Sequence, residues 1–393
     1  MADGDNNIGE LLPVDVLIEV LLRLPTSSLR RFRLACRLWR DIIDTHTTEM
    51  QSRPKMLVTT VDTIHLVEEG LPSSRWTGAG YDGMSLVGTC TGLVCMYDSQ
   101  EPNGPIILAN PVTGEMLAIS LPPPMRHAKA TSDSRLTFAF MYHPTTGRYK
   151  VLHVPYSFDK VWLFTLGEAL WRDVATGSPT EIYDISKGMV NIDGMVYWAV
   201  KGWEAKVVSF DLNSEHVASV RPLPKVLSRH GSWHLVEARG KLGVAFSRGW
   251  WTADKTEVWV MEHGMAGRRR TWSHWYNIIM EKPVDQLAHQ HQLTLPISFT
   301  THDDDSEFDD VLTMRWDSYQ EGGRCYGGYV SYKHKPSNDV KKQAKHGVVE
   351  ISERDRGAEV AVIPTHHIRP RTFAYVETTE PLSVYWLVFG YPC

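Results

Sequence analysis

The sequence predicts a mixed α+β protein with a small helical head at the N-terminus and a large all-β body. Residues 9–50 have the spacing of amphipathic helices, whereas later residues form short β-branched and aromatic runs bounded by Gly, Pro, Asp or Asn. The chain has 393 residues, which is enough for a small module and a large domain. We expect residues 1–8 to be a disordered tail, 51–55 a linker and 56–393 the body.

Composition excludes several classes of protein. Hydrophobic residues make up 42% of the chain and charged residues 22%, which excludes a disordered chain. A formal net charge of -5 gives no general attraction to nucleic acid or to an anionic membrane. Five widely spaced cysteines without a CxxC pair argue against a disulfide framework and a zinc finger. Charged residues interrupt the early apolar stretch 11–24, so we expect an intracellular protein, cytoplasmic or nuclear.

The body contains a weak internal repeat. The turn at Gly194 and the strand after it recur in outline at Gly240, 46 residues later. Trp171 and Trp272 are 101 residues apart, roughly twice that interval. Intervals of about 45–50 residues are typical of propeller blades, each of which has four strands. We prefer a closed β-propeller of roughly six to eight blades because it leaves few exposed strand edges. An irregular two-sheet sandwich is the alternative.

The head begins with a predicted amphipathic helix. Pro13 suits the first helical turn, and Leu17, Val20, Leu21 and Leu24 follow at the spacing of one apolar face. We expect Pro25 to end this helix.

A second helical stretch follows, with capping hydroxyls at residues 26–28 and arginines between its apolar positions. The apolar positions have a 3-4-3-4 spacing: Leu29, Phe32, Cys36, Trp39 and Ile43. A unit of about 40 residues is near the size that needs a metal, a disulfide or a partner for stability. Part of its apolar surface should be covered by another chain or by the body, and the pattern alone leaves both possibilities open.

The head resembles an F-box over its whole length. The matching residues are Leu12-Pro13-x-Asp15-x-Leu17-x-Glu19-Val20-Leu21-x-Arg23-Leu24-Pro25 and Ser28-Leu29-x-Arg31-Phe32-Arg33-x-x-Cys36-x-x-Trp39-Arg40-x-Ile42-Ile43. F-box proteins use this three-helix element to bind the Skp-type adaptor of a cullin-RING ubiquitin ligase. The resemblance implies that these residues form or support the adaptor contact: Leu12, Pro13, Val16, Val20, Leu21, Leu24, Pro25, Leu29, Phe32 and Trp39.

The body resembles the F-box-associated domain of plant F-box proteins, which is related in style to kelch propellers. The resemblance rests on segments that recur in order: Gly88-Thr89-Cys90-Thr91-Gly92-Leu93-Val94-Cys95, Asn110-Pro111-x-Thr113-Gly114-Glu115, His143-Pro144-x-Thr146-Gly147-x-Tyr149-Lys150-Val151, Val161-x-x-Phe164-Thr165-Leu166 and Ser209-Phe210-Asp211-Leu212. It covers about residues 85–280, and residues 372–377 resemble the closing segment of the domain. We expect the Asn-Pro and Pro-x-Thr-Gly pieces to be turns with glycine at positive φ.

No catalytic motif is present in the sequence. There is no GxSxG, and the glycine-rich residues 88–92 lack the Lys-Ser/Thr ending of a P-loop. The paired histidines of 289–291 and 366–367 have no metal-site context, so we expect no metal and no cofactor. The acidic run 302–310 and the basic run 333–345 are predicted to be solvated loops.

These observations predict a substrate receptor of an SCF-type ubiquitin ligase rather than an enzyme. The head would hold the Skp-type adaptor and, through it, the cullin-RING ligase, while loops at one mouth of the body would hold an unknown protein target. Two alternatives stay open. One is a scaffold that binds an adaptor-like partner without ubiquitin transfer, and the other is a propeller enzyme whose catalytic residues converge from several blades.

Overall fold

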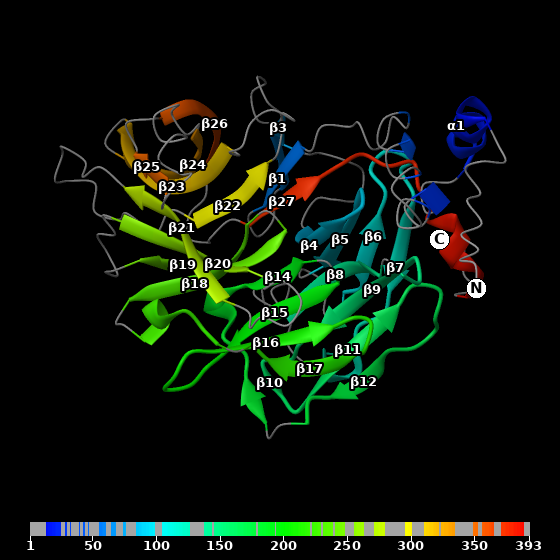
Figure 1. The fold of residues 1–393 in the computed structure, drawn as a ribbon, viewed down its shortest axis with the longest axis horizontal. Coiled ribbons are helices and arrows are strands. Elements are labelled where there is room, and N and C mark those ends of the chain that lie inside the picture. The colour runs from blue at the N-terminus through cyan, green and yellow to red at the C-terminus, as the bar shows by residue number, and fades with distance from the viewer. Residues whose placement is uncertain are drawn as a thin grey trace, which may run out of the picture.

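Antiparallel β-sheet makes up most of the protein (Figure 1). The computed structural model describes residues 13–24, 28–29, 32, 39, 42–43, 46, 55–59, 64–67, 74–75, 84–98, 104–125, 137–143, 145–177, 180–192, 194–220, 222–228, 231–238, 240–247, 255–262, 271–279, 295–300, 310–321, 324–334, 349–352, 356–364 and 371–388. The N-terminal helix α1 spans Val14–Leu22, and residues 28–29, 32, 39, 42–43 and 46 are also helical. Among all the residues that the structure describes, no helix has the length and apolar character needed to cross a membrane.

Three sheets come from the first half of the body and its last strand. The first sheet has the order β27 (Arg371–Tyr375), β1 (Lys55–Thr59), β2 (Ile64–Val67) and β3 (Ser74–Arg75). The second has β4 (Met84–Cys90), β5 (Leu93–Asp98), β6 (Ile106–Ala109) and β7 (Met116–Ile119). The third has β8 (Phe138–His143), β9 (Arg148–His153), β11 (Lys160–Thr165) and β12 (Arg172–Ala175).

Three further sheets follow in chain order. The fourth has β14 (Met189–Ile192), β15 (Met195–Val200), β16 (Lys206–Asp211) and β17 (His216–Ser219). The fifth has β18 (Ser232–Ala238), β19 (Lys241–Ser247), β20 (Lys255–Glu262), β21 (Thr271–Ile279) and, parallel to β21, β25 (Val349–Ser352). The sixth has β22 (Leu295–Thr300), β23 (Asp310–Glu321), β24 (Arg324–His334) and β26 (Arg356–Pro364).

The first strands of these sheets follow one another around a closed ring. Each contacts the next in the order β27, β4, β8, β14, β18 and β22, and β22 contacts β27 again. The ring closes where β27, from the C-terminal end, pairs with β1 in the register from Lys55↔Tyr375 to Thr59↔Arg371. This is the arrangement of a β-propeller, not of a two-sheet sandwich. Lys55, which we expected to end the linker, is the first residue of β1.

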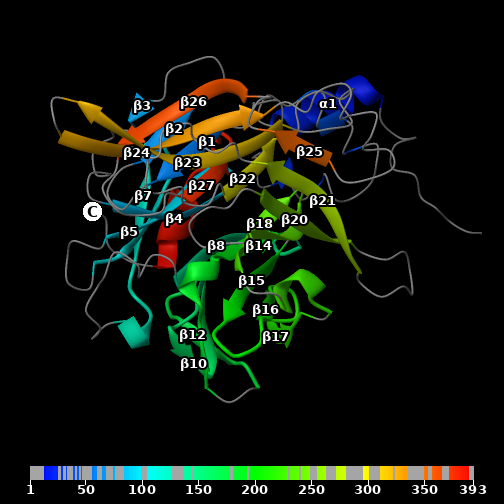
Figure 2. The same ribbon diagram turned by 90° about the vertical axis from the view of Figure 1, so that its left-hand side faces the viewer.

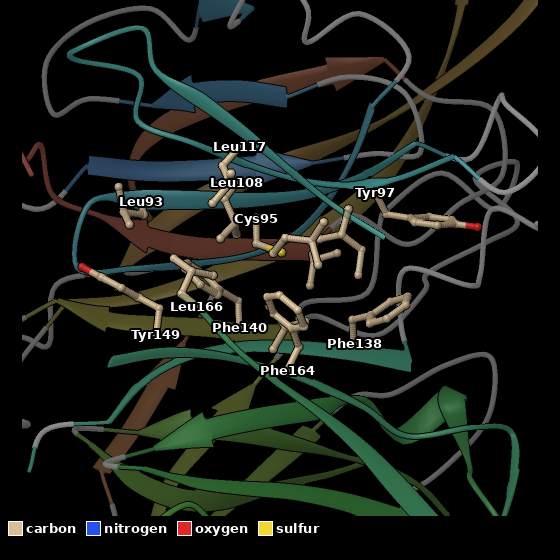
Figure 3. Packing of buried hydrophobic residues seen from close by; sticks show 14 of the residues in the cluster. Leu93, Cys95, Tyr97, Leu108, Leu117, Phe138, Phe140, Tyr149, Phe164 and Leu166 are labelled. Atoms are coloured by element: carbon tan, nitrogen blue, oxygen red, sulfur yellow. The ribbon is translucent and has the colours of Figure 1, made fainter. Parts of the chain in front are cut away.

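Neighbouring sheets share apolar cores. Figure 3 shows the core between the second and third sheets, where Cys95 and Leu108 face Phe140 and Phe164. A second core joins the third sheet to the fourth, and a third core joins the fourth to the fifth. Strands that are covered on both faces are apolar at successive positions, as in β5, where residues 93–97 are all buried.

The two tryptophans that mark the repeat lie in equivalent places. Trp171 directly precedes β12 and Trp272 lies in β21, and β12 and β21 are the fourth strands of sheets two steps apart in the ring. The indole nitrogen of Trp171 donates a hydrogen bond of 2.7 Å to the carbonyl oxygen of Ser120, just after β7. Trp272 donates a bond of the same length to the carbonyl oxygen of Pro222, shortly after β17. Each tryptophan thus links its sheet to the end of the preceding sheet.

The predicted Asn-Pro turn is confirmed between β6 and β7. The Asn110 side-chain oxygen accepts hydrogen bonds from the backbone nitrogens of Val112, at 2.9 Å, and Thr113, at 3.3 Å. Gly114 follows with φ +73°, a backbone conformation that residues with a Cβ rarely adopt. The Asn110 amide nitrogen also donates to the carbonyl oxygen of Glu380, 2.7 Å away. The turn therefore holds the C-terminal segment as well as its own hairpin.

A buried carboxylate fixes that C-terminal segment to the body. Glu380 lies beyond β27 and is buried, and its carboxylate accepts hydrogen bonds from the hydroxyls of Tyr149, at 2.7 Å, and Tyr385, at 3.3 Å. Glu115 in turn accepts from the backbone nitrogen of Leu382, at 2.7 Å. The segment after β27 thereby attaches to both the second and the third sheet, which reinforces the closed ring.

The Trp171 link predicts a loss of stability on substitution. Trp171→Phe removes the indole donor to Ser120 and part of a ring that packs 5.4 Å from Phe164, measured between ring centroids. We expect the free energy of unfolding of the body to fall by about 2 kcal/mol, measured by urea unfolding of the full chain. The neighbouring Leu170→Ala is the control, because Leu170 is 73% exposed and should change stability by less than about 0.5 kcal/mol. Equal midpoints for the two variants would contradict the link.

Candidate functional site

Helix α1 is built as its sequence predicts. The carbonyl oxygen of Pro13, the residue before the helix, accepts a hydrogen bond of 3.1 Å from the backbone nitrogen of Leu17. Asp15 lies in the first turn, where a negative charge is favourable beside the free N–H groups. At the other end, the backbone nitrogen of Arg23 donates to the carbonyl oxygen of Val20, at 3.2 Å. The helix is short, so its stability depends on what its apolar side chains contact.

The head has an apolar core of its own. Among the described residues, this core consists of Leu17, Leu21, Leu29, Ile42 and Ile43. Four partly buried side chains pack against it, namely Ile18, Leu24, Phe32 and Trp39. The rings of Phe32 and Trp39 meet edge to face with their centroids 4.8 Å apart. The predicted 3-4-3-4 spacing is thus confirmed at its four described positions, and no residue of the described part of the body belongs to this core.

Helix α1 also carries apolar side chains that face away from this core. Val16 and Val20 are exposed by 43% and 48%, and because they lie four residues apart they share one face of the helix. Val14 and Leu22 are about half exposed on another side. Apolar side chains that are exposed together on one helix form a candidate contact surface for another chain. We call Val16 and Val20 the open face of α1.

The expected adaptor-contact residues that the structure describes fall into three groups by their exposure. Pro13, Val16 and Val20 are exposed and lie on the surface of the head. Leu24, Phe32 and Trp39 are partly buried, and Leu21 and Leu29 lie inside the core of the head. Leu12 and Pro25 lie outside the described residues.

The apolar face that the spacing predicts for this helix is buried only in part. Leu17 and Leu21 are buried, whereas Val20, which the spacing places on the same face, is exposed. Val14 and Leu22 are exposed apolar residues that the spacing did not single out. The signal was present in the sequence, since a helix that is apolar on several sides exceeds what one contact buries.

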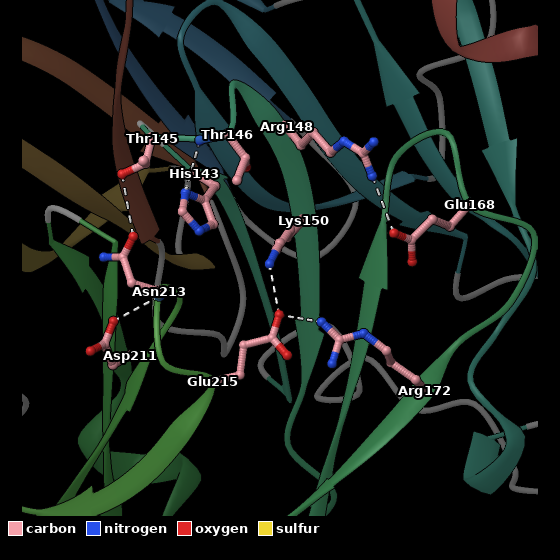
Figure 4. A network of polar contacts seen from close by, with 10 residues as sticks. All are labelled: His143, Thr145, Thr146, Arg148, Lys150, Glu168, Arg172, Asp211, Asn213 and Glu215. Carbon is pink, nitrogen blue, oxygen red and sulfur yellow. Dashed lines mark hydrogen bonds and ion pairs between the residues drawn. The ribbon is translucent and has the colours of Figure 1, made fainter. Parts of the chain in front are cut away.

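The body carries a charged network between its third and fourth sheets (Figure 4). Glu215, in the turn between β16 and β17, accepts from the ammonium of Lys150 in β9 at 2.9 Å and also pairs with Arg172 at the start of β12. These bonds, that of Arg172 foremost, lower the pKa of the Glu215 carboxyl to about 2. A carboxylate held between two cations is an acceptor only, so this network joins two sheets and offers no general base.

Two other titratable groups of the body are equally unsuited to catalysis. Burial lowers the pKa of His153 to about 3, and its ring lies 4.7 Å from that of Phe138 between centroids. Burial raises the pKa of the Cys95 thiol, which keeps it protonated and unreactive. Within the described ranges, no three His, Cys, Asp or Glu side chains gather in a way that would hold a metal ion. None of Glu215, His153 and Cys95 is therefore poised as a nucleophile or a general base.

Several sequence features lie outside the described residues. They are the acidic residues 302–309, the basic residues 335–345 and the paired histidines of 289–291 and 366–367, whereas three end residues of the two predicted loops lie in strands, Asp310 in β23 and Lys333 and His334 in β24. The expectations for these segments stay predictions.

Comparison with known proteins identifies both parts of the chain. Residues 10–48 match the family described as F-box domain, and residues 72–366 match the family described as F-box associated beta propeller domain. The second match spans most of the chain.

Among curated relatives, F-box protein At5g65850 of Arabidopsis thaliana is 26% identical over 67% of this chain and 69% of its own length. F-box protein At3g07870 of the same plant is 25% identical over 68% and 73%. F-box/kelch-repeat protein At3g23880, also from Arabidopsis thaliana, is 26% identical over 67% and 78%.

Among solved structures, the chain is similar to the beta-propeller domain of Myceliophteria thermophila Cps50 (Swd1), with 9% identity, 80% and 88% of the two chains covered and a TM-score of 0.37. TolB from Acinetobacter baumannii gives a TM-score of 0.39 at 11% identity, with 87% and 73% covered. These likenesses are too weak to support an argument.

The charged network predicts a pH-dependent contribution to stability. The pKa of Glu215 is lower in the folded chain than its ordinary 4.5, so its stabilising effect is present above about pH 4.5 and is lost toward pH 2. At pH 7 we expect Glu215→Gln to lower the free energy of unfolding by about 1–2 kcal/mol, since the pair is partly exposed. The difference from wild type should shrink between pH 4.5 and 2 in urea titrations. A difference that stays constant over this range would contradict the ionic role.

Proposed function

The chain belongs to the F-box proteins with an F-box associated β-propeller domain, and from this membership we propose that it is a substrate receptor of an SCF-type ubiquitin ligase. The family has a non-enzymatic adaptor role. In this proposal the head binds the Skp-type adaptor of the ligase, and the propeller binds a protein target. Ubiquitin transfer follows because a target lysine gains a high effective concentration near the loaded conjugating enzyme.

The observation that carries this proposal is the open face of α1. Val16 and Val20 are exposed on a helix whose leucines already have a core within the head. The head therefore does not need the propeller to bury its core, and its remaining apolar surface is available to another chain. In the proposed complex, Val16, Val20 and Pro13 touch the adaptor directly, while Leu21 and Leu29 support the contact by fixing the helices from inside.

The propeller supports the second half of the proposal. We count each of the six ring sheets as one blade, so the proposed propeller has six blades, at the low end of the predicted range. A closed ring holds its connecting loops on a rigid scaffold, which is where binding specificity usually lies. Kelch-like character, the three-helix form of the head and a cytoplasmic or nuclear location stay predictions.

The test is binding of a purified Skp-type adaptor to the full chain. The double variant Val16→Asp, Val20→Asp places two carboxylates on the open face of α1. These carboxylates would lose their bound water on contact with the adaptor. We expect retention in a pull-down to fall at least about tenfold, with an unchanged thermal unfolding midpoint because both side chains are exposed in the free chain.

Val112→Asp is the matched control for this test, since Val112 is a valine of the propeller with 47% exposure. It should bind the adaptor as wild type does. Equal retention of the double variant and wild type would contradict adaptor binding through α1. A scaffold that holds the adaptor without ubiquitin transfer differs from the proposed receptor only in the lifetime of its target.

A further inference from the structure

A second exposed apolar surface lies on the propeller, at the end of the molecule opposite α1. Tyr156 and Ile182 are exposed by 50% and 42%, and Trp203 is fully exposed. A small sheet of β10 (Ser157–Phe158) and β13 (Glu181–Ile182) lies outside the six ring sheets. Ile182 belongs to β13, and Tyr156 directly precedes β10. Both views show β10 at the bottom of the molecule and α1 at the top (Figures 1 and 2).

Three loops build this surface and fix one another through their backbones. The backbone nitrogen of Tyr183 donates to the carbonyl oxygen of Tyr156, and that of Lys201 donates to the carbonyl oxygen of Ile182, both at 2.8 Å. Ser157 pairs with Ile182 between β10 and β13. The loops come from two neighbouring sheets, the third and the fourth. The backbones of these loops are therefore held in place before any partner arrives, which lowers the entropic cost of binding.

The exposure of these side chains is not the result of a missing core. Phe158 and Tyr183, the neighbours of Ser157 and Ile182 in the same segments, are buried, and Phe158 packs edge to face on Trp198 with centroids 6.0 Å apart. Ile182 and Tyr183 are successive residues of an extended segment, so their side chains point to opposite sides. Tyr183 supplies the core, and the outward Ile182 is not needed for it.

A cation lies within the same surface. The ammonium of Lys201 donates a hydrogen bond of 2.9 Å to the hydroxyl of Tyr156, and in the described part of the chain it forms no ion pair. Of the carboxylates nearby, Glu181 pairs with Lys206, whereas Asp184 accepts hydrogen bonds from Ser186, keeps its charge and still attracts Lys201 through space. Lys201 is exposed and has no direct ion pair with either carboxylate, so an incoming anion can reach it.

Besides Asp184, a second negative charge opposes this preference. Glu204 lies in the same loop as Lys201 and Trp203 and is exposed. Its carboxylate would repel an anionic partner at close range and reduce affinity without changing which apolar side chain docks.

We propose that Tyr156, Ile182, Trp203 and Lys201 form the surface that binds the target protein, and that the bound segment carries an apolar side chain next to an anionic group. This inference rests on the proposed receptor function and names the target surface for it. Exposed aromatic residues dominate the energetics of many protein interfaces, and a lysine beside them selects for an anion. Placement opposite α1 lets target and adaptor bind at the same time. The anion is a carboxylate or a phosphate.

The test uses a displayed library of random peptides rather than an unidentified target. Peptides are selected on the full wild-type chain and counter-selected on Lys201→Gln, Trp203→Ala. The enriched peptides should carry an acidic residue beside an aromatic or aliphatic one. In fluorescence anisotropy, the best synthetic peptide should bind Trp203→Ala and Lys201→Gln at least about tenfold more weakly than wild type. Glu204→Gln should bind it more tightly.

Leu170→Ala is the matched control, because Leu170 is an exposed apolar residue of a different loop and should leave peptide affinity unchanged. Replacing the acidic residue of the peptide by phosphoserine shows whether phosphate or carboxylate is preferred. Selection that yields no peptide able to distinguish wild type from Trp203→Ala would overturn the proposed surface. Adaptor retention, measured on the same proteins, separates this failure from a failure of the receptor function, since the variants leave α1 untouched.

Discussion

The pairing of β1 with β27 is the constraint on which the rest of the protein depends. It joins residues from opposite ends of the chain and makes the ring of sheets continuous, so that neighbouring sheets can share their cores. The ion pair of Lys55 with Glu377, at 2.7 Å, and the buried carboxylate of Glu380 lie next to this closure. Because the head directly precedes β1 in sequence, the element proposed to bind the adaptor is attached where the ring closes.

The titratable groups that the fold perturbs most belong to the scaffold. The strongly shifted pKa values of the described residues belong to groups buried in a core or paired between sheets, as for His153 and Glu215. Perturbed groups often mark active sites, but here Glu215 pairs with cations of the neighbouring sheet and the pKa of His153 is lowered by burial alone. Two exposed apolar surfaces stand out among the described residues, the open face of α1 and the surface of Tyr156, Ile182 and Trp203 beside β10, and the two views place α1 and β10 at opposite ends. Both are suited to protein contacts.

Features set by short-range pattern were predictable from the sequence, and features set by distant contacts were not. The core positions Leu29, Phe32 and Ile43 follow from helical spacing, and the Asn110 turn follows from its own side chain. The outward side of Val20 did not follow, because α1 is apolar on several sides and spacing alone does not say which side meets the core. The surface at Trp203 requires three loops to meet, a result of ring geometry that no local motif encodes.

The central claim is that the head offers the open face of α1 to another protein while the propeller stays closed and unchanged. Hydrogen exchange of the full chain, with and without a saturating Skp-type adaptor, tests it most directly. The account predicts slower exchange of the backbone amides of residues 14–24 when the adaptor is present, and unchanged exchange in the paired strands β1 and β27. Unchanged exchange in α1, or protection confined to the propeller, would contradict it.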